Sequence, residues 1–192
     1  MAKSLKGTQT EKNLLKSFAG ESQARNRYTF FASVARKDGY EQIANIFTET
    51  AGNEKEHAEI FFKYLKGGDL EITASYPAGI IGKTEENLKA AADGEKMEWS
   101  VLYAEFEKTA RAEGFEDIAT SFKEIAEVEE FHEKRYRKLA KNIAAGEVFK
   151  KNKTVKWHCT NCGYIHEGPE APDVCPACKH VKAYYELLAE NY

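Results

Sequence analysis

Two stretches of the sequence repeat one pair of potential metal ligands. Glu54 and His57 lie in NEKEH, and Glu129 and His132 lie in VEEFH, with two residues between the members of each pair. Residues three apart share one face of a helix, so both side chains of a pair can bind the same metal centre. A single Glu-x-x-His pair in a charged helix is more often a surface pair. The repetition is therefore what favours a metal site.

Helical spacing places both pairs inside apolar stripes. In steps of three and four, Glu129 and His132 fall between Ile125 and Tyr136, and the earlier pair is flanked in the same way. The same count turns three further glutamates inward: Glu21, Glu95 and Glu98. The charged neighbours of His132 fall off the apolar face, where we expect solvated side chains: Glu127, Glu130, Glu133 and Lys134.

Five inward glutamates and two histidines would be costly to bury unless their charge were compensated. Two metal cations would compensate it. One Glu from each of two helices and a Glu-x-x-His pair from each of the other two form the ligand set of carboxylate-bridged di-iron sites. We expect Glu54 and Glu129 to bridge two irons, with His57 and His132 beside them; manganese is the commonest substitute in such sites.

One residue is inserted in the second half of the chain relative to the first. Glu21 aligns with Glu95 at a shift of 74 residues, whereas Tyr28 aligns with Tyr103 at a shift of 75. A π-bulge is the usual way in which a helix absorbs such an insertion, and these bulges favour functional sites. We therefore predict a π-bulge within residues 95–103 that helps Glu98, which has no glutamate counterpart in the first half, to reach the metals.

Tyr28 and Tyr103 lie near the ligands in sequence and on the inward helix faces. As hydrogen-bond donors they would orient the ligating carboxylates. As core aromatics they would need only a partner for the hydroxyl group. The sequence supports both interpretations equally.

The C-terminal region holds four cysteines in two Cys-x-x-Cys pairs separated by 12 residues: Cys159, Cys162, Cys175 and Cys178. Two such pairs predict a tetrahedral four-sulfur metal site. Zinc would make it a structural ribbon and iron an electron carrier, and the geometry permits both. We favour iron because a di-iron motif stands beside it. Nearby His158, His166 and His180 are not required, since four sulfurs complete the tetrahedron.

Four long helices are needed to bring these ligands together, and the periodicity predicts them over residues 8–36, 40–66, 84–113 and 115–145. Residues 67–83 contain Pro77 and four glycines, which indicates a long crossover between two helix pairs. The pairs are related, because Ala35–His57 matches the segment 75 residues later at 11 of 23 positions without a gap. The sequence thus predicts a mainly α fold, a ferritin-like four-helix bundle.

We expect the bundle to occupy residues 1–146, a lysine-rich linker residues 147–154, and a small metal-knuckle domain residues 155–192. The last domain is too small to build a large core, so it needs a metal to fold.

Composition excludes several classes of protein. The 192 residues carry a formal charge of −3, which gives no basic field for nucleic acid. The first residues lack the apolar core of a signal peptide, and no run of about 18 apolar residues indicates a membrane span. Cysteines confined to one short segment fit a reducing compartment. We therefore expect a cytoplasmic protein.

These motifs together resemble the rubrerythrin family over essentially the full chain. The resemblance is carried by GESQARNRY, NEKEH, GEKME and VEEFH, followed by the two cysteine knuckles, whose CGY and CP segments are similar to those of rubredoxin. All metal-ligand positions of the family's pattern hold a matching residue here. They are Glu21, Glu54, His57, Glu95, Glu98, Glu129 and His132 for two irons, and the four cysteines for a single iron.

The resemblance implies a homodimeric non-haem peroxidase that reduces hydrogen peroxide to water in oxidative stress defence. Electrons would come from NADH or NADPH through a separate reductase or rubredoxin, and pass through the single iron to the di-iron site. It also implies that one iron exchanges Glu98 for His57 between its oxidised and reduced states. Glu98, His57, Tyr28 and Tyr103 are accordingly the candidate catalytic residues.

Two other functions remain open on the sequence. The bundle alone would support ferroxidase activity and iron handling, as in ferritins, although the cysteine module counts against this. The chain could also be a zinc-ribbon interaction protein whose bundle site is only structural.

Overall fold

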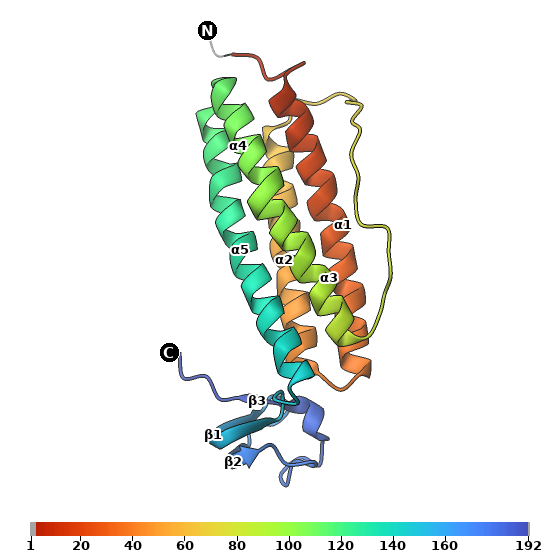
Figure 1. The fold of residues 1–192 in the computed structure, drawn as a ribbon, viewed down its shortest axis with the longest axis vertical. Helices are drawn as coiled ribbons and strands as arrows, with labels where there is room; N and C mark the ends of the chain where they lie inside the picture. The colour runs from red at the N-terminus through yellow and green to blue at the C-terminus, as the bar shows by residue number, and fades with distance from the viewer. Residues whose placement is uncertain (1–2, 192) are drawn as a thin grey trace.

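The computed structural model describes residues 3–191, which form an elongated helical bundle with a small β domain at one end (Figure 1). The bundle consists of α1 (Gln9–Lys37), α2 (Glu41–Tyr64), α3 (Thr84–Met97), η1 (Glu98–Leu102), α4 (Tyr103–Ala112) and α5 (Glu116–Ala144). Because α3, η1 and α4 follow one another without a break, they make up the third long helix. The predicted four-helix architecture is confirmed.

The helix boundaries follow from local chemistry. The hydroxyl of Thr8 accepts a hydrogen bond from the backbone N–H of Glu11 (3.1 Å), which caps the start of α1. Gly39 and Gly114 end the first helix of each pair with φ angles of 85° and 79°. Glycine adopts this left-handed conformation without steric cost, which explains why the duplicated halves share it.

The predicted π-bulge is present. Residues Glu98–Leu102 form η1, a single π-helical segment between α3 and α4. The inserted residue is therefore absorbed inside the helix rather than in a loop.

The crossover between α2 and α3 carries no helix or strand from residue 65 to residue 83, as expected. It runs along α1 on the outside of the bundle (Figure 1). The hydroxyl of Tyr76 ties it down by donating to the backbone carbonyl of Lys16 (2.8 Å).

The apolar core of the bundle has two parts. One part includes Phe31, Phe47 and Tyr136, and the other includes Leu14 and Phe122. Along every helix the inward glutamates and histidines lie between the residues of these two clusters. The polar site is therefore closed by apolar packing on both sides. Within residues 3–191, no helix combines the length and apolarity needed to cross a membrane.

The C-terminal domain is built on an antiparallel sheet of order β2-β1-β3, with β1 (Lys150–Cys159), β2 (Ile165–Glu170) and β3 (Tyr185–Leu187), and a short 3-10 helix, η2 (Lys182–Tyr184). Its small core surrounds Trp157, whose indole N–H donates to the carbonyl of Gly168 (3.1 Å). The domain meets the bundle where Phe149 stacks on Tyr40, with ring centroids 6.0 Å apart.

The expected linker over residues 147–154 is partly wrong. Strand β1 begins at Lys150, which pairs with Glu170, and the register is irregular between Lys150 and Val155. The lysine-rich segment therefore forms the start of β1. The pairing of Lys150 joins residues 20 apart in the chain, a contact that local composition does not predict.

Candidate metal centres

The inward residues of the four long helices converge at one place in the bundle. Five are fully buried or nearly so, with exposed fractions of 0–2%: Glu21, Glu54, Glu95, Glu129 and His132. His57 is 7% exposed and Glu98 is 9% exposed. All seven predicted ligands thus lie in the core, although an isolated buried carboxylate is costly.

Six of the seven form two overlapping groups of four. One group is Glu21, Glu54, His57 and Glu129, and the other is Glu54, Glu95, Glu129 and His132. Within each group the potential ligand atoms lie within 4.8 Å of one another. The two groups share Glu54 and Glu129, which is the arrangement of two metal ions bridged by two carboxylates.

Two tyrosines hold the outer carboxylates by crossed hydrogen bonds. The hydroxyl of Tyr28 in α1 donates to Glu95 Oε1 in α3 (2.5 Å), and the hydroxyl of Tyr103 in α4 donates to Glu21 Oε1 in α1. Each duplicated half therefore supports a carboxylate of the other half. Both rings also lie in the apolar clusters, so each tyrosine contributes an aromatic ring to the core and a hydrogen bond to a candidate ligand.

The histidines bind the shared carboxylates. His57 Nδ1 lies 2.8 Å from Glu129 Oε1 and 3.1 Å from Glu54 Oε2, and His132 Nδ1 lies 2.7 Å from Glu129 Oε2. Burial alone would lower the pKa values of the two imidazoles, but hydrogen bonds to Glu129 and Glu54 raise them to about 10 for His57 and about 9 for His132. For Glu54, the same hydrogen bonds outweigh the effect of burial and lower the pKa to about 2.

The outer carboxyl groups are affected in the opposite direction. Burial, reinforced by the charges of Glu129 and Glu54, raises the pKa values of Glu21 and Glu95 well above the usual range. The same causes raise the pKa of Glu98 to about 8. Without cations the site therefore holds protons where a metal centre would hold positive charge.

The carboxylate oxygens provide a direct test of whether metal ions fit. Glu21 and Glu95 each have one buried side-chain oxygen, Oε2, that accepts no hydrogen bond from the described residues. Buried polar atoms are almost always paired, so two unpaired carboxylate oxygens in one buried site need an explanation. Hard divalent or trivalent cations supply it, because carboxylate oxygen and imidazole nitrogen are ligands that iron and manganese prefer.

Glu98 is the predicted ligand that belongs to neither group. It begins η1, and its side chain faces a cavity between α1, α4 and the crossover. His57, in contrast, belongs to the ligand group that contains Glu21. Glu98 and His57 therefore differ: His57 lies within a group of potential ligand atoms, and Glu98 lies beside it.

The expectation of a solvated Glu133 is wrong. Its side chain is buried, accepting hydrogen bonds from the indole N–H of Trp99 (2.7 Å) and from Arg137 Nε (2.7 Å). Its neighbours Glu127 and Lys134 are exposed, as expected. Counting apolar positions in steps of three and four did not predict the burial of Glu133, because its hydrogen-bond donor Trp99 lies in η1. A π-helical turn changes which side chains face α5.

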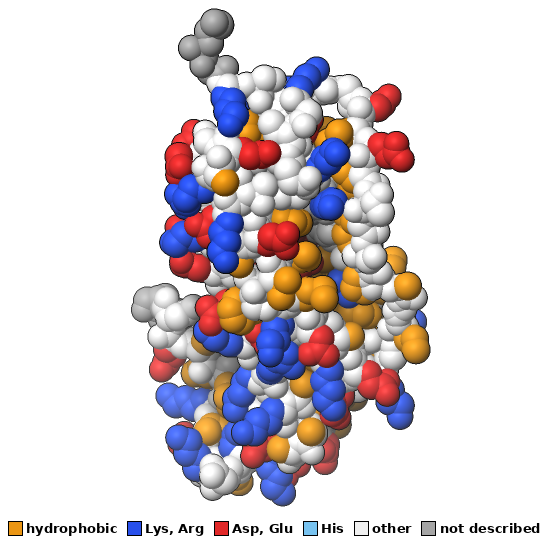
Figure 2. All heavy atoms as spheres, turned by 45° about the horizontal axis from the view of Figure 1, so that its top comes forward, with side chains coloured by type: hydrophobic (Ala, Val, Ile, Leu, Met, Phe, Trp, Pro, Cys, Tyr) orange, Lys and Arg blue, Asp and Glu red, His pale blue; other side chains and the backbone are white. Residues whose placement is uncertain are grey.

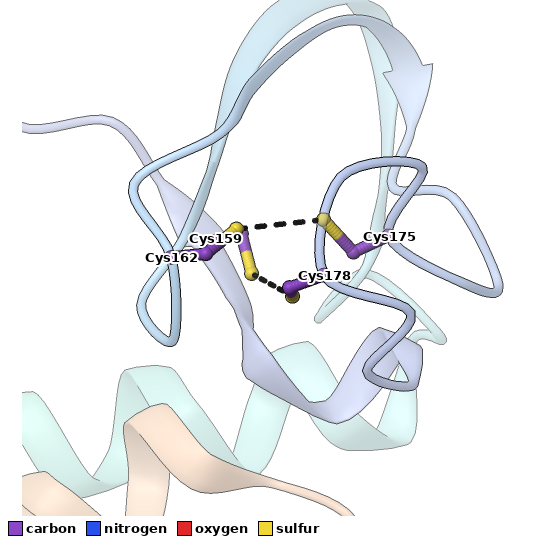
Figure 3. Close-up of side chains that lie close together, drawn as sticks. All are labelled: Cys159, Cys162, Cys175 and Cys178. Carbon is purple, nitrogen blue, oxygen red and sulfur yellow. Dashed lines mark hydrogen bonds between the residues drawn. The ribbon is translucent and has the colours of Figure 1, made fainter.

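The four cysteine sulfurs face one another between two loops of the β domain (Figure 3). Cys159 Sγ lies 3.8 Å from Cys178 Sγ, and Cys162 Sγ lies 3.7 Å from Cys175 Sγ. A backbone hydrogen bond from His180 lowers the pKa of the Cys178 thiol to about 6, which favours the thiolate that a metal requires. As expected, His158, His166 and His180 stay outside the four-sulfur group.

Comparisons with known proteins agree with both sites. The family model described as Rubrerythrin matches residues 12–140, and the model described as Rubrerythrin, rubredoxin-like domain matches residues 157–186. A rubrerythrin of Porphyromonas gingivalis is 58% identical over 192 residues, which cover 100% of this chain and 96% of that protein. A rubrerythrin of Nitratidesulfovibrio vulgaris is 57% identical over 190 residues, covering 99% of this chain and 100% of that protein.

Among solved structures, nigerythrin in its fully reduced, all-ferrous state is 32% identical, with a TM-score of 0.64 over 97% of this chain and 90% of that one. Symerythrin of Cyanophora paradoxa, 22% identical with a TM-score of 0.62, covers 75% of this chain and 90% of that one, and shares the fold. The bundle thus carries a carboxylate and histidine site suited to two irons, and the β domain carries a rubredoxin-like four-cysteine knuckle. From both family matches and the identity over nearly its whole length, this chain belongs to the rubrerythrin family.

Proposed function

We propose that the protein is a non-haem di-iron peroxidase that reduces hydrogen peroxide to water. The observation that carries this proposal is the presence, in one chain, of two ligand groups sharing two carboxylates and a separate four-cysteine site. When bound, the two irons supply together the two electrons that cleavage of the O–O bond requires. An iron held by the four cysteines would supply electrons to the bundle site one at a time, which a ferritin-like bundle alone could not arrange.

The residues of the chain would divide the work as follows. Glu54 and Glu129, which belong to both ligand groups, would hold both metals, with Glu21 and His57 at one position and Glu95 and His132 at the other. The remaining four ligands, for a single iron, are Cys159, Cys162, Cys175 and Cys178.

The tyrosines act through the carboxylates that they hold. The hydroxyls of Tyr28 and Tyr103 fix Glu95 and Glu21 by hydrogen bonds, which keeps each carboxylate oriented while its metal changes charge. Their pKa values are raised well above 10, chiefly by burial, so both keep the proton with which they donate.

Glu98 and His57 are proposed to alternate as ligands of one iron. The proposal is supported by their different placement, since His57 stands in a ligand group and Glu98 stands beside it. Burial raises the pKa of Glu98 to about 8, so a Glu98 that is not bound to metal carries a proton near neutral pH. That proton is available to an oxygen atom leaving the peroxide bond.

A reductase using NADH or NADPH, or a rubredoxin, is the proposed electron donor to the β domain. The domain touches the start of α2, and Glu54 lies 13 residues beyond Glu41, about 20 Å along the helix axis. A second copy of the chain in a homodimer would offer a shorter path, because its β domain could approach the middle of the bundle. The homodimer is therefore part of the proposal.

Metal analysis and steady-state kinetics test the proposal together. Protein made in iron-replete cells is expected to contain three irons per chain and to oxidise NADH with hydrogen peroxide when a rubredoxin reductase is added. Zinc in the cysteine site of such protein would overturn the electron relay. Iron in all three positions without peroxide-dependent NADH oxidation would overturn the peroxidase.

A further inference from the structure

A cavity of about 460 Å³ lies between α1, the crossover and the α3–α4 helix. It extends from Gln9 to Arg27 along α1, which corresponds to about 27 Å of helix. Of the seven candidate ligands of the bundle, Glu98 alone lines it. The cavity therefore leads from the surface to the edge of the proposed di-iron site.

This space is far larger than hydrogen peroxide requires. A water molecule, only slightly smaller than hydrogen peroxide, takes up about 30 Å³ in the liquid, whereas pockets for small organic ligands measure about 300–1,000 Å³. The cavity volume lies in the second range. Its size thus fits an organic molecule that carries a reactive group at one end.

The side chains around the cavity favour a largely apolar, neutral ligand. Tyr76, Met97, Leu102 and Phe106 contribute apolar surface. Figure 2 shows hydrophobic side chains in the recess beside the crossover, with Lys and Arg side chains near its edge. The charged residues that line it are of both signs, so no strong field of one sign selects a charged ligand: Lys16, Arg27, Glu98 and Glu105.

Ser17 supplies a polar group without a partner. It lines the cavity and is 3% exposed, and its buried hydroxyl makes no hydrogen bond with the described residues. Such a hydroxyl normally finds a partner, so it is suited to an oxygen atom of a bound ligand.

Tyr76 and Gly20 shape the end of the cavity near the metals. A Cβ atom added to Gly20 would lie 3.6 Å from the Tyr76 ring, an ordinary van der Waals distance, so the ring packs directly over this position of α1. Gly20 immediately precedes Glu21. The aromatic ring is therefore held over the helix next to the ligands by its hydrogen bond to Lys16.

We infer that this cavity binds the organic part of a neutral organic hydroperoxide, with the peroxide group directed toward Glu98. The inference rests on the proposed function and extends its substrate class. The O–O bond of ROOH breaks, and two electrons and two protons convert it to the alcohol ROH and one water. A reduced di-iron site held by the bundle ligands would supply the two electrons, and the external reductase would replace them through the cysteine site.

The kinetic test compares cumene hydroperoxide with hydrogen peroxide in the full-length, iron-loaded protein. The measured quantity is the ratio of the kcat/KM values for the two substrates. Ser17→Leu, which places a larger apolar side chain in the cavity, is expected to lower this ratio at least about tenfold. Ser33→Leu, the same change at an exposed position on α1, should leave the ratio unaltered.

A second pair of variants covers the case in which Ser17→Leu does not fold. Tyr76 is 38% exposed and lies on the crossover, so its replacement is compatible with folding. Tyr76→Ala removes the ring and should raise the KM for cumene hydroperoxide several-fold. Tyr76→Phe keeps the ring and should change this KM much less.

A binding measurement without turnover completes the test. Cumyl alcohol, the product expected from cumene hydroperoxide, is titrated calorimetrically into the oxidised full-length protein. Saturable binding to one site per chain, weakened at least tenfold by Ser17→Leu or Tyr76→Ala, is the expected result. Absence of saturable binding, or binding that neither variant weakens, would overturn the inference.

The outcomes separate this inference from the proposed function. Reduction of hydrogen peroxide without reduction of cumene hydroperoxide overturns the inference alone, as does a substrate ratio that neither cavity variant changes. Reduction of neither substrate overturns the peroxidase proposal and, with it, the extension of the substrate class.

Discussion

Loading the bundle site with metal is expected to release several protons. In the metal-free protein, burial raises the pKa values of Glu21 and Glu95 well above the usual range and that of Glu98 to about 8. Hydrogen bonds to carboxylates hold the pKa values of His57 and His132 at about 10 and about 9. Glu98, His132 and His57 therefore carry a proton at pH 7, the raised pKa values of Glu21 and Glu95 favour the protonated forms of those carboxyl groups as well, and each group must lose its proton to bind a metal ion. Loading should release at least about three protons per chain, or about two if Glu98 stays off the metal.

The pH dependence of this release has a defined sign. Above pH 8 the metal-free Glu98 is already ionised, so the number released should fall by about one, and it should fall again as the pH passes about 9 and 10, where the histidines lose their protons. Below pH 7 Glu98 and the two histidines stay protonated, so metal affinity should drop steeply as the solution becomes more acidic.

Calorimetry in two buffers of different ionisation enthalpy measures the number of protons released. The protein is stripped of bundle metal while the cysteine site keeps its iron, so that thiol protons do not contribute, and it is titrated with Mn²⁺. Glu98→Gln is the matched variant and should release about one proton fewer than the unaltered protein at pH 7. Release of one proton or fewer by the unaltered protein would refute the reasoning, because the ligands would then already be ionised without metal.

Three further substitutions have defined outcomes. Cys162→Ser should abolish turnover with an external reductant but leave single-turnover oxidation of the reduced bundle site intact; surviving turnover would show that the β domain is not the relay. Glu133→Ala should lower the free energy of unfolding by about 2 kcal/mol in denaturant titrations, whereas exposed Glu127→Ala should change it by less than about 0.5 kcal/mol. Equal effects would contradict the buried role of Glu133. Tyr103→Phe removes the donor to Glu21 and should weaken metal binding about tenfold in chelator competition, and unchanged affinity would contradict the orienting role of the tyrosine.

Much of the site was predictable because helices convert spacing into direction. Helical periodicity alone placed Glu54 and His57 in the core. Their copies at Glu129 and His132 made a metal site a better explanation than a surface pair, which a single Glu-x-x-His motif more often is. The π-bulge was predictable for a different reason. The two halves align at a shift of 74 residues before the insertion and 75 after it, so the one extra residue between Glu95 and Tyr103 had to be absorbed locally.

What the sequence missed depends on contacts between distant segments. Glu133 was expected at the surface because the count assumed a regular helix, whereas η1 brings Trp99 within hydrogen-bond distance of it. Strand β1 extends back to Lys150 through pairing with Glu170, which composition does not indicate. The cavity beside Glu98 exists because Tyr76 fastens the crossover to α1, and nothing in the local pattern of residues 67–83 predicts where that segment packs.

The most direct test of the central proposal is the rate at which peroxide oxidises the reduced protein. The fully reduced, iron-loaded protein is mixed in a stopped-flow spectrometer with hydrogen peroxide in one experiment and with an equal concentration of oxygen in another. A peroxidase should be oxidised much faster by hydrogen peroxide, with two electrons leaving the bundle site together. Much faster oxidation by oxygen would contradict the proposal and favour a ferroxidase.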